Sequence, residues 1–138
     1  MKVLIDTNIL ISAMLGQGTP FRAYVKAATF PNQGVICDQN IDEMRRVFNR
    51  KFPQKVPVME RFLSLALQTL DVVRVPAREA VQERNVRDVY DRPILRAALA
   101  ANVDVLLTGD RDFLESGITE IRIMNPATFL QLEGNHEA

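Results

Sequence analysis

The chain has 138 residues and a net charge of zero, with 17 basic and 17 acidic side chains. This length fits one domain and is short for two. The composition, 47% hydrophobic and 25% charged, is ordinary for a globular protein and excludes collagen-like, coiled-coil and disordered chains. One cysteine, Cys37, cannot form an internal disulfide. With one histidine, His136, the sequence also lacks the ligands of a structural zinc site, so a bound metal would need oxygen ligands.

No apolar run reaches the roughly 18 residues that a membrane span requires. The first predicted strand meets an acid, Asp6, after three apolar residues, which leaves no room for a signal-peptide core. We therefore expect no membrane segment and a cytoplasmic location. Zero net charge gives no general electrostatic argument for nucleic-acid binding, although 13 of the 17 basic residues are Arg, which suits phosphate contacts.

Short apolar runs alternate with segments of helical period along the chain. The predicted strands are residues 3–5, 35–37, 72–75, 105–107 and 121–124. The predicted helices are an apolar one after the first strand and residues 19–30, 40–51, 57–70, 94–101 and 126–130. Continuous apolar strands separated by helices indicate a parallel sheet that is covered on both faces. The sequence thus predicts one α/β domain over residues 1–132, followed by a polar tail, 133–138.

Acidic residues stand at the ends of predicted strands or at the starts of predicted helices. These acids are Asp6, Glu43, Asp88, Asp91, Asp110 and Asp112. In open parallel sheets, ligand sites form beyond the carboxyl ends of the strands, so we expect these acids along one edge. Carboxylates that converge without a lysine repel one another unless a cation neutralises them. Oxygen-only ligation favours Mg²⁺ or Mn²⁺, and such centres are typical of phosphodiester hydrolysis.

Each acid also has a structural interpretation that the sequence leaves open. Asp88 and Asp91 stand where helix caps are common, and Glu43 could be a solvated acid in a first helical turn. Asp112 could cap a short helix over residues 113–116.

Asp6 is the hardest of the acids to explain structurally. It lies between an apolar strand and an apolar helix, and a half-buried carboxylate there needs a partner. Thr7 and Asn8 could donate hydrogen bonds to it, or could cap the helix that follows.

Together these segments resemble the PIN domain family. Residues 3–13, Val-Leu-Ile-Asp-Thr-Asn-Ile-Leu-Ile-Ser-Ala, look like that family's first strand, first metal-binding acid and DTN motif. Residues 40–48, 86–98 and 107–114 resemble its second, third and fourth acidic segments. Residues 123–130 fit a subgroup of toxin components from toxin–antitoxin pairs. The match covers the chain from end to end.

The resemblance implies a three-layer α/β/α sandwich around a five-stranded parallel sheet. Carried over residue by residue, the catalytic and metal-binding acids would be Asp6, Glu43, Asp91 and Asp110. Asp88 and Asp112 would be auxiliary acids, and Asn8 and Thr108 would support the ligands by hydrogen bonds. The third segment departs from the pattern of the subgroup at Val89-Tyr90 and Arg92-Pro93, but no matched carboxylate is lost.

The function implied by the resemblance is that of a Mg²⁺- or Mn²⁺-dependent endoribonuclease, similar to VapC-type toxins. Hydrolysis would leave a 5′-phosphate and a 3′-hydroxyl, and the expected partners are RNA, a cognate antitoxin and a second copy of the chain. The segment 52–70 could pack into the core or form the dimer face. The arginines near the acids could bind the RNA backbone or pair with neighbouring acids: Arg45, Arg46, Arg87, Arg92, Arg96 and Arg111.

Other functions fit the sequence less well. Phosphatases of the haloacid-dehalogenase type need a second Asp two residues after the first, and Asn8 stands there. These phosphatases also need a lysine near the site, and the four lysines of this chain do not follow that pattern. A receiver-type signalling domain needs a lysine after a late strand, and this chain has no lysine there. A non-catalytic module that binds metal and either RNA or a protein partner remains open.

Overall fold

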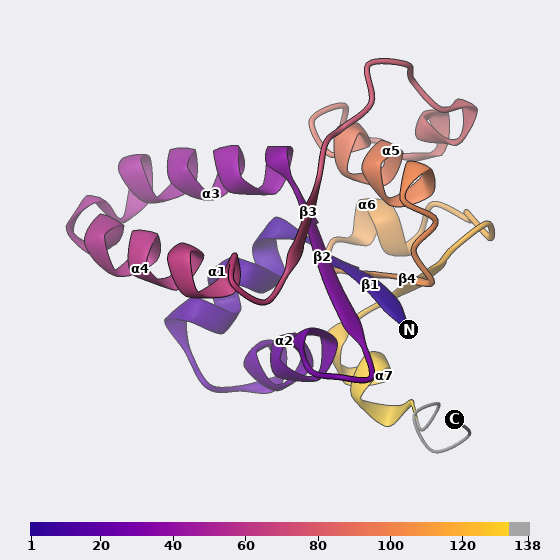
Figure 1. Cartoon of the computed structure of the whole chain (residues 1–138). Coiled ribbons are helices and arrows are strands. Elements are labelled where there is room, and N and C mark those ends of the chain that lie inside the picture. Colours follow the sequence, from indigo (N-terminus) through magenta and orange to yellow (C-terminus); the bar gives the residue numbers. More distant parts are fainter. Residues whose placement is uncertain (133–138) are drawn as a thin grey trace.

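Five short strands form one parallel sheet at the centre of the computed structural model, which describes residues 1–132 (Figure 1). The strands are β1 (Lys2–Ile5), β2 (Gln33–Cys37), β3 (Asp71–Val73), β4 (Val105–Leu107) and β5 (Arg122–Met124). They lie in the order β3-β2-β1-β4-β5, and every neighbouring pair is parallel. The predicted α/β class with a five-stranded parallel sheet is confirmed. The predicted polar tail, 133–138, and His136 lie outside the described residues.

The order of the strands creates a switch point beside β1. From β1 the chain builds outward through β2 to β3, and then returns to the other side of β1 to place β4 and β5. Connections therefore leave the carboxyl ends of β1 and β4 in opposite directions. The crevice that opens between such strands is where open α/β sheets bind ligands.

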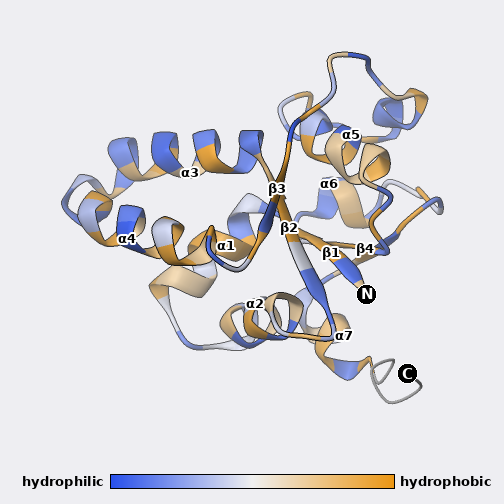
Figure 2. Ribbon diagram, in the orientation of Figure 1, coloured by the Kyte–Doolittle hydropathy of each residue, from blue (hydrophilic) through white to orange (hydrophobic). Residues whose placement is uncertain are grey.

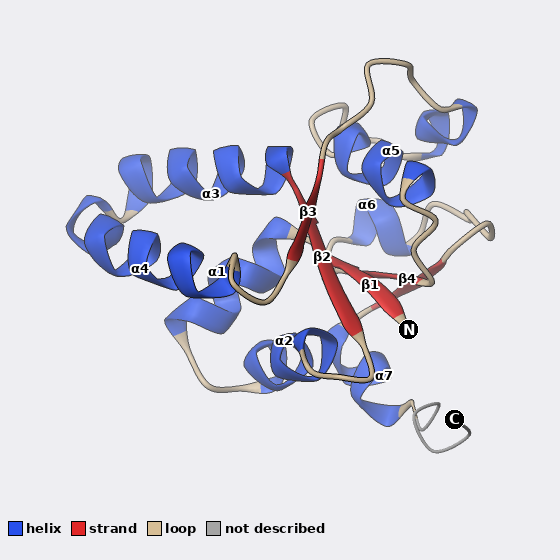
Figure 3. Ribbon diagram, in the orientation of Figure 1, coloured by secondary structure: helices blue, strands red, loops and turns tan. Residues whose placement is uncertain are grey.

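Helices cover both faces of the sheet (Figure 3). The α-helices are α1 (Thr7–Leu15), α2 (Thr19–Ala28), α3 (Asp38–Lys51), α4 (Val56–Ala66), α5 (Arg92–Ala100), α6 (Arg111–Leu114) and α7 (Pro126–Gln131). Two 3₁₀ turns, Pro53–Lys55 and Val81–Asn85, join them. Proline stands in the first turn of α2, α4, α5 and α7. Backbone N–H groups in a first turn have no partner within the helix, so the lack of an N–H in proline costs no hydrogen bond there.

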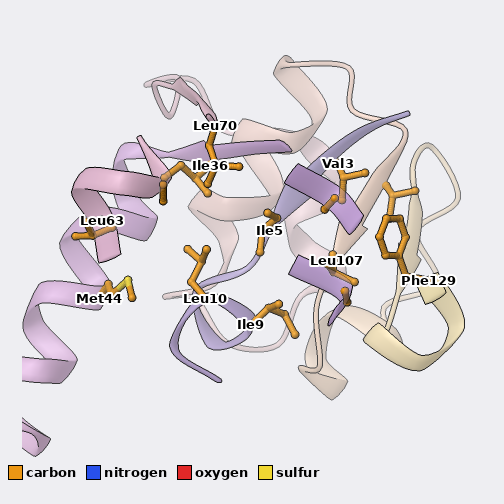
Figure 4. Packing of buried hydrophobic residues seen from close by; sticks show 14 of the residues in the cluster. Val3, Ile5, Ile9, Leu10, Ile36, Met44, Leu63, Leu70, Leu107 and Phe129 are labelled. Atoms are coloured by element: carbon orange, nitrogen blue, oxygen red, sulfur yellow. The ribbon is translucent and has the colours of Figure 1, made fainter. Parts of the chain in front are cut away.

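The alternation of side chains along the strands divides the interior into two cores. Val3 and Ile5 of β1 pack with α1, α2, α3, α4 and α7, and Figure 4 shows part of this cluster. Leu4 points to the opposite face and packs with α5 and α6. Each fully buried aliphatic side chain contributes about 1.5–3 kcal/mol through its removal from water. Two cores on either side of one sheet make the three-layer sandwich that was predicted.

The structure moves several of the predicted boundaries. The second strand begins at Gln33 and not at residue 35, α2 ends at Ala28 and not at residue 30, and α5 begins at Arg92 and not at residue 94. The third strand ends at Val73 and not at residue 75, because β2 ends at its partner Cys37 and the N–H of Val75 turns to the carboxylate of Asp38. The predicted helix 57–70 ends at Ala66, and the chain then turns through residues 67–70. The fifth strand begins at Arg122 and not at residue 121.

Candidate metal centre

The carboxyl ends of β1 and β4 bring two acids together at the switch point of the sheet. Asp6 directly follows β1, and its N–H donates to the carbonyl oxygen of Leu107 at 2.9 Å, which extends the ladder between β1 and β4. Asp110 lies three residues after the end of β4. The two carboxylates are close enough for the charge of Asp110 to raise the pKa of Asp6. Backbone pairing therefore fixes the centre of the site.

Asp6 is buried, with 4% of its surface exposed, and both of its carboxylate oxygens have partners. Oδ1 accepts a hydrogen bond of 2.8 Å from the N–H of Thr7, and Oδ2 accepts one of 2.7 Å from Oγ1 of Thr108. Burial raises the pKa of Asp6 to about 6, even though the two hydrogen bonds act in the opposite direction. These contacts hold the carboxylate in one orientation at the carboxyl end of β1.

A chain of hydrogen bonds connects Glu43 on α3 to the first strand and helix. The N–H of Cys37 donates to Oδ1 of Asn40 at 2.8 Å, and Nδ2 of Asn40 donates to Oγ1 of Thr7 at 2.9 Å. The Thr7 hydroxyl then donates to Oε1 of Glu43 at 3.4 Å. Burial and the charge of Asp6 raise the pKa of Glu43 to about 7. Glu43 therefore faces the site, and the interpretation of Glu43 as a fully solvated acid does not hold.

Asp91 is the acid with the clearest need for a cation. It occupies the N-cap position of α5, but its side chain makes no capping hydrogen bond, so the capping interpretation is wrong. Its Oδ2 is buried and has no hydrogen-bond partner among the described residues. Burial and the adjacent Asp110 carboxyl raise its pKa to about 8, and the charges of Asp6 and Asp88 add to the rise. An unpaired buried oxygen among acids fits a divalent cation.

Asp110 is held by the turn that begins α6. Its Oδ1 accepts a hydrogen bond of 2.9 Å from the N–H of Asp112, and its own N–H donates to Oγ1 of Thr108 at 3.0 Å. Asp110 thus caps a helix over Arg111–Leu114, whereas the sequence left open a helix over 113–116 with Asp112 as its cap. Asp112 is thereby free to point its carboxylate elsewhere.

The two auxiliary acids lie beside Asp91. One carboxylate oxygen from each of Asp88, Asp91 and Asp112 lies within 4.8 Å of the others. Asp112 also pairs with Nε of Arg87 at 2.8 Å, and Asp88 accepts a hydrogen bond from the N–H of Tyr90 at 2.9 Å. The six acids predicted for the site therefore gather at one edge of the sheet. Asp91 adjoins Asp88 and Asp112 on one side and lies close to Asp110 and Asp6 on the other.

Of the residues predicted to support the ligands, Thr108 contacts Asp6 directly. Asn8 is exposed, and its side chain makes no hydrogen bond within residues 1–132. Thr7 and Asn40 make the supporting contacts on that side of the site. Asn40 did not emerge from the sequence, although it continues the buried stripe of Met44 on α3 at a spacing of four residues. A polar side chain in such a stripe is a signal of an internal hydrogen-bonding role.

Most of the arginines near the site are bound to neighbouring acids. Arg45 binds Glu60, and Arg96 binds Glu83, each through two hydrogen bonds. Arg87 and Arg111 share Glu115, and Arg92 donates to a backbone carbonyl oxygen. Arg46 is the exception, because it is exposed and has no hydrogen bond or ion pair to any described residue. Its charge lowers the pKa of Glu43.

Comparisons with known proteins agree with this architecture. A family model described as "PIN domain" matches residues 2–112. No curated protein sequence matches the chain. The structure of VapBC2 from Rickettsia felis, bound to a DNA fragment from their promoter, is similar with a TM-score of 0.70 and 18% identity, over 91% of this chain and 98% of that chain.

Two further solved structures are similar in fold. PAE2754 from Pyrobaculum aerophilum has a TM-score of 0.65 at 21% identity, over 94% of this chain and 87% of that chain. VapC20 from Mycobacterium tuberculosis, a sarcin–ricin loop cleaving toxin, has a TM-score of 0.59 at 18% identity, over 87% and 98% of the two chains. Within residues 1–132, none of the helices has the length and apolar character to cross a membrane.

Proposed function

Because the chain belongs to the PIN domain family, we propose that its acidic centre hydrolyses RNA phosphodiester bonds with the help of Mg²⁺ or Mn²⁺. The metal-binding and catalytic acids in this proposal are Asp6, Glu43, Asp91 and Asp110, with Asp88 and Asp112 as auxiliary acids. The observation that carries it is the buried Oδ2 of Asp91, which has no hydrogen-bond partner among residues 1–132 and lies among like charges. Once Asp91 is ionised, a cation stabilises such an oxygen, and in the metal-free protein a proton takes that place.

The protein's own residues prepare the acids for this task. Thr108 and the N–H of Thr7 fix the two oxygens of Asp6, and the Asn40–Thr7 chain orients Glu43. A bound Mg²⁺ or Mn²⁺ would supply Lewis-acid polarisation of the scissile phosphate and would lower the pKa of a water molecule. Ligands that are fixed in advance do not have to reorganise when the metal and substrate bind.

The direct test is cleavage of a mixed-sequence RNA by the purified protein with Mg²⁺ or Mn²⁺, followed by analysis of the product ends. The proposal predicts 5′-phosphate and 3′-hydroxyl ends, and no cleavage once a chelator removes the metal. Cleavage that persists in chelator and leaves a cyclic phosphate would contradict it. Metal binding without cleavage of any RNA would favour the alternative, a non-catalytic module that binds RNA or a protein partner.

We also propose that the protein is the toxin of a toxin–antitoxin pair and acts in the cytoplasm. An apolar hollow between α2 and α4 supports a protein partner, since Tyr24, Val25, Phe62 and Leu65 line it. Leu65 is 60% exposed and Val25 42% exposed. Contiguous exposed apolar side chains mark interaction surfaces. Co-expression with the neighbouring gene product should yield a stable complex if that product is the antitoxin.

The proposal includes a homodimer. In the segment 52–70, α4 buries Met59 and Leu63 in the core, yet it leaves Val58 and Leu65 exposed, so the segment serves the core and still offers an apolar face. Because Leu65 also lines the hollow between α2 and α4, a dimer through this face would compete with an antitoxin bound there. Light scattering of the isolated protein should give twice the mass of the chain. A monomer at high micromolar concentration would contradict the dimer and would leave the nuclease proposal intact.

A further inference from the structure

The positive charge of the chain is concentrated in one part of the sequence. Residues 45–61 contain six basic side chains and one acidic one, so this segment carries a charge of +5 in a protein whose net charge is zero. The rest of the chain therefore carries −5. The basic residues are Arg45, Arg46, Arg50, Lys51, Lys55 and Arg61, and all six are exposed.

This segment forms the distal part of a helical hairpin that begins at the acidic centre. α3 starts at the carboxyl end of β2, carries Glu43 in its second turn, and runs outward beside α4 (Figure 1). Most residues of α3 are hydrophilic, whereas α4 is mostly hydrophobic (Figure 2). Fourteen residues of α-helix extend about 21 Å, at a rise of about 1.5 Å per residue. The hairpin therefore extends the surface of the site well beyond the sheet.

Two of the arginines lie in line with Glu43. Arg46 is three residues and Arg50 seven residues after Glu43, and this spacing places the three side chains on one face of α3. Both arginines are exposed, and neither makes a hydrogen bond or ion pair with a residue in the range 1–132. Arg45, on the side toward α4, is held by Glu60. Arg46 and Arg50 thus keep their donors available for a ligand.

Helix stability accounts for part of this charge. Cations in the last turn of a helix interact favourably with its dipole, and Arg50 and Lys51 stand in the last turn of α3. That effect fades within one turn, so it does not explain Arg46 in the middle of the helix. It also does not explain the exposed bases on the following turn and on α4.

We propose that α3 carries a phosphate-binding track, in which Arg46 and Arg50 contact successive phosphates of an RNA strand that extends from the acidic centre. The inference rests on the proposed ribonuclease function and assigns the path of its substrate. The clustered acids repel RNA, and a positive surface beside them offsets this repulsion. Because phosphate contacts carry no sequence information, the track contributes affinity and orientation without selecting the bases.

The test compares two double variants that remove the same charge. Arg46→Gln/Arg50→Gln alters the track, whereas Arg22→Gln/Arg122→Gln alters two exposed arginines on α2 and at the start of β5. The register of β5 places Arg122 at the amino end of the sheet, opposite the acids. Each variant also carries Asp6→Asn to prevent cleavage. Binding of a labelled single-stranded RNA is measured by fluorescence anisotropy in chelator, at two salt concentrations.

The track variant should bind RNA roughly tenfold more weakly than the Asp6→Asn parent, and its salt dependence should fall by about two counterions. The matched control should stay within about twofold of the parent, and circular dichroism should show both variants folded. Equal affinities in the two variants would overturn the track and would leave the ribonuclease proposal standing. Absence of RNA binding by the Asp6→Asn parent, together with absence of RNA cleavage by the wild type in Mn²⁺, would overturn both proposals.

Discussion

Oγ1 of Thr108 donates a 2.7 Å hydrogen bond to Oδ2 of Asp6, and this contact joins residues that are 102 positions apart in the sequence. The same hydroxyl oxygen accepts a hydrogen bond from the N–H of Asp110 at 3.0 Å. Its single proton is therefore directed at Asp6, while its lone pair positions the turn that carries Asp110. One threonine after β4 thus couples the two acids at the switch point of the sheet.

Replacement of Thr108 should weaken metal binding by disorienting Asp6. Thr108→Val keeps the shape of the side chain and removes its hydroxyl, and we expect a loss of about 10- to 100-fold in Mn²⁺ affinity by titration calorimetry. Thr108→Ser keeps the hydroxyl and should restore most of the affinity. A Val variant that binds Mn²⁺ as tightly as the Ser variant would show that the hydrogen bond does not position a ligand.

Asn40 should be important for stability as well as for the site. The Asn40 side chain accepts from the N–H of Cys37 and donates to the hydroxyl oxygen of Thr7 in a fully buried position. Asn40→Ala therefore leaves the N–H of Cys37 without a partner and removes the hydrogen bond that the Thr7 oxygen accepts. We expect a loss of about 2 kcal/mol in the free energy of unfolding, measured with urea. Asn49→Ala, an exposed position on the same helix, should change it by less than about 0.5 kcal/mol. Equal effects at the two positions would refute this role.

The metal-free protein should lose stability as the pH rises. Burial and mutual repulsion raise the pKa values of Asp6, Glu43 and Asp91 to about 6, 7 and 8 in the folded state. In the unfolded chain such acids titrate near pH 4, so the folded state binds more protons between about pH 4 and 8. The free energy of unfolding therefore falls across this window. Melting curves in chelator should show it directly.

Two variants separate this effect from the titration of other groups. Asp91→Asn removes the acid with the highest pKa and should stabilise the metal-free protein at pH 8.5 by about 1 kcal/mol, whereas Asp42→Asn, an exposed acid, should not. Mn²⁺ competes with protons for the same oxygens, so its stabilising effect should be largest at the alkaline end. Uniform stabilisation by Mn²⁺ from pH 5 to 8.5 would contradict the assignment.

Arg96 should prove structural despite its proximity to the acids in the sequence. It forms two hydrogen bonds with Glu83, whose side chain is almost fully buried, and a third with the carbonyl oxygen of Pro76. Arg96→Gln removes the charged partner of that acid, which keeps the N–H of Ala80 as a donor, and should cost about 3 kcal/mol in the free energy of unfolding. Arg45→Gln breaks an exposed pair and should cost less than about 1 kcal/mol. Urea denaturation checks both, and equal costs would contradict the prediction.

Much of the architecture could be predicted from the sequence because it depends on local patterns. Apolar runs such as 3–5 and 105–107 set the strands, and acids directly after them fall at one edge of any parallel sheet. The sequence could not show that Asn40 reaches Thr7 across 33 residues, because no local pattern encodes which polar side chains meet. The end of β3 was misplaced for the same reason, since Val75 turns to Asp38 across 37 residues.

The ion pairs of the arginines could not be predicted from the sequence either. A guanidinium next to an acid in the sequence has the same chemistry whether it binds substrate or a neighbouring carboxylate. Arg96 and Glu83 are 13 residues apart and lie on different elements, so their ion pair appears only once the loop before α5 is folded. Arg46 differs from these arginines because it has no hydrogen bond or ion pair within residues 1–132. The sequence alone does not show whether an arginine has such a partner.

In the proposed nuclease, Asp6 and Asp91 would hold a divalent metal that RNA cleavage requires, and one experiment tests this requirement most directly. Wild type, Asp6→Asn, Asp91→Asn and the exposed control Asp42→Asn are compared on one mixed-sequence RNA in Mn²⁺, with and without chelator. We predict cleavage by wild type and by Asp42→Asn, a loss of more than about 100-fold in the other two variants, and no cleavage in chelator. Cleavage by Asp6→Asn or Asp91→Asn at the wild-type rate would contradict the account.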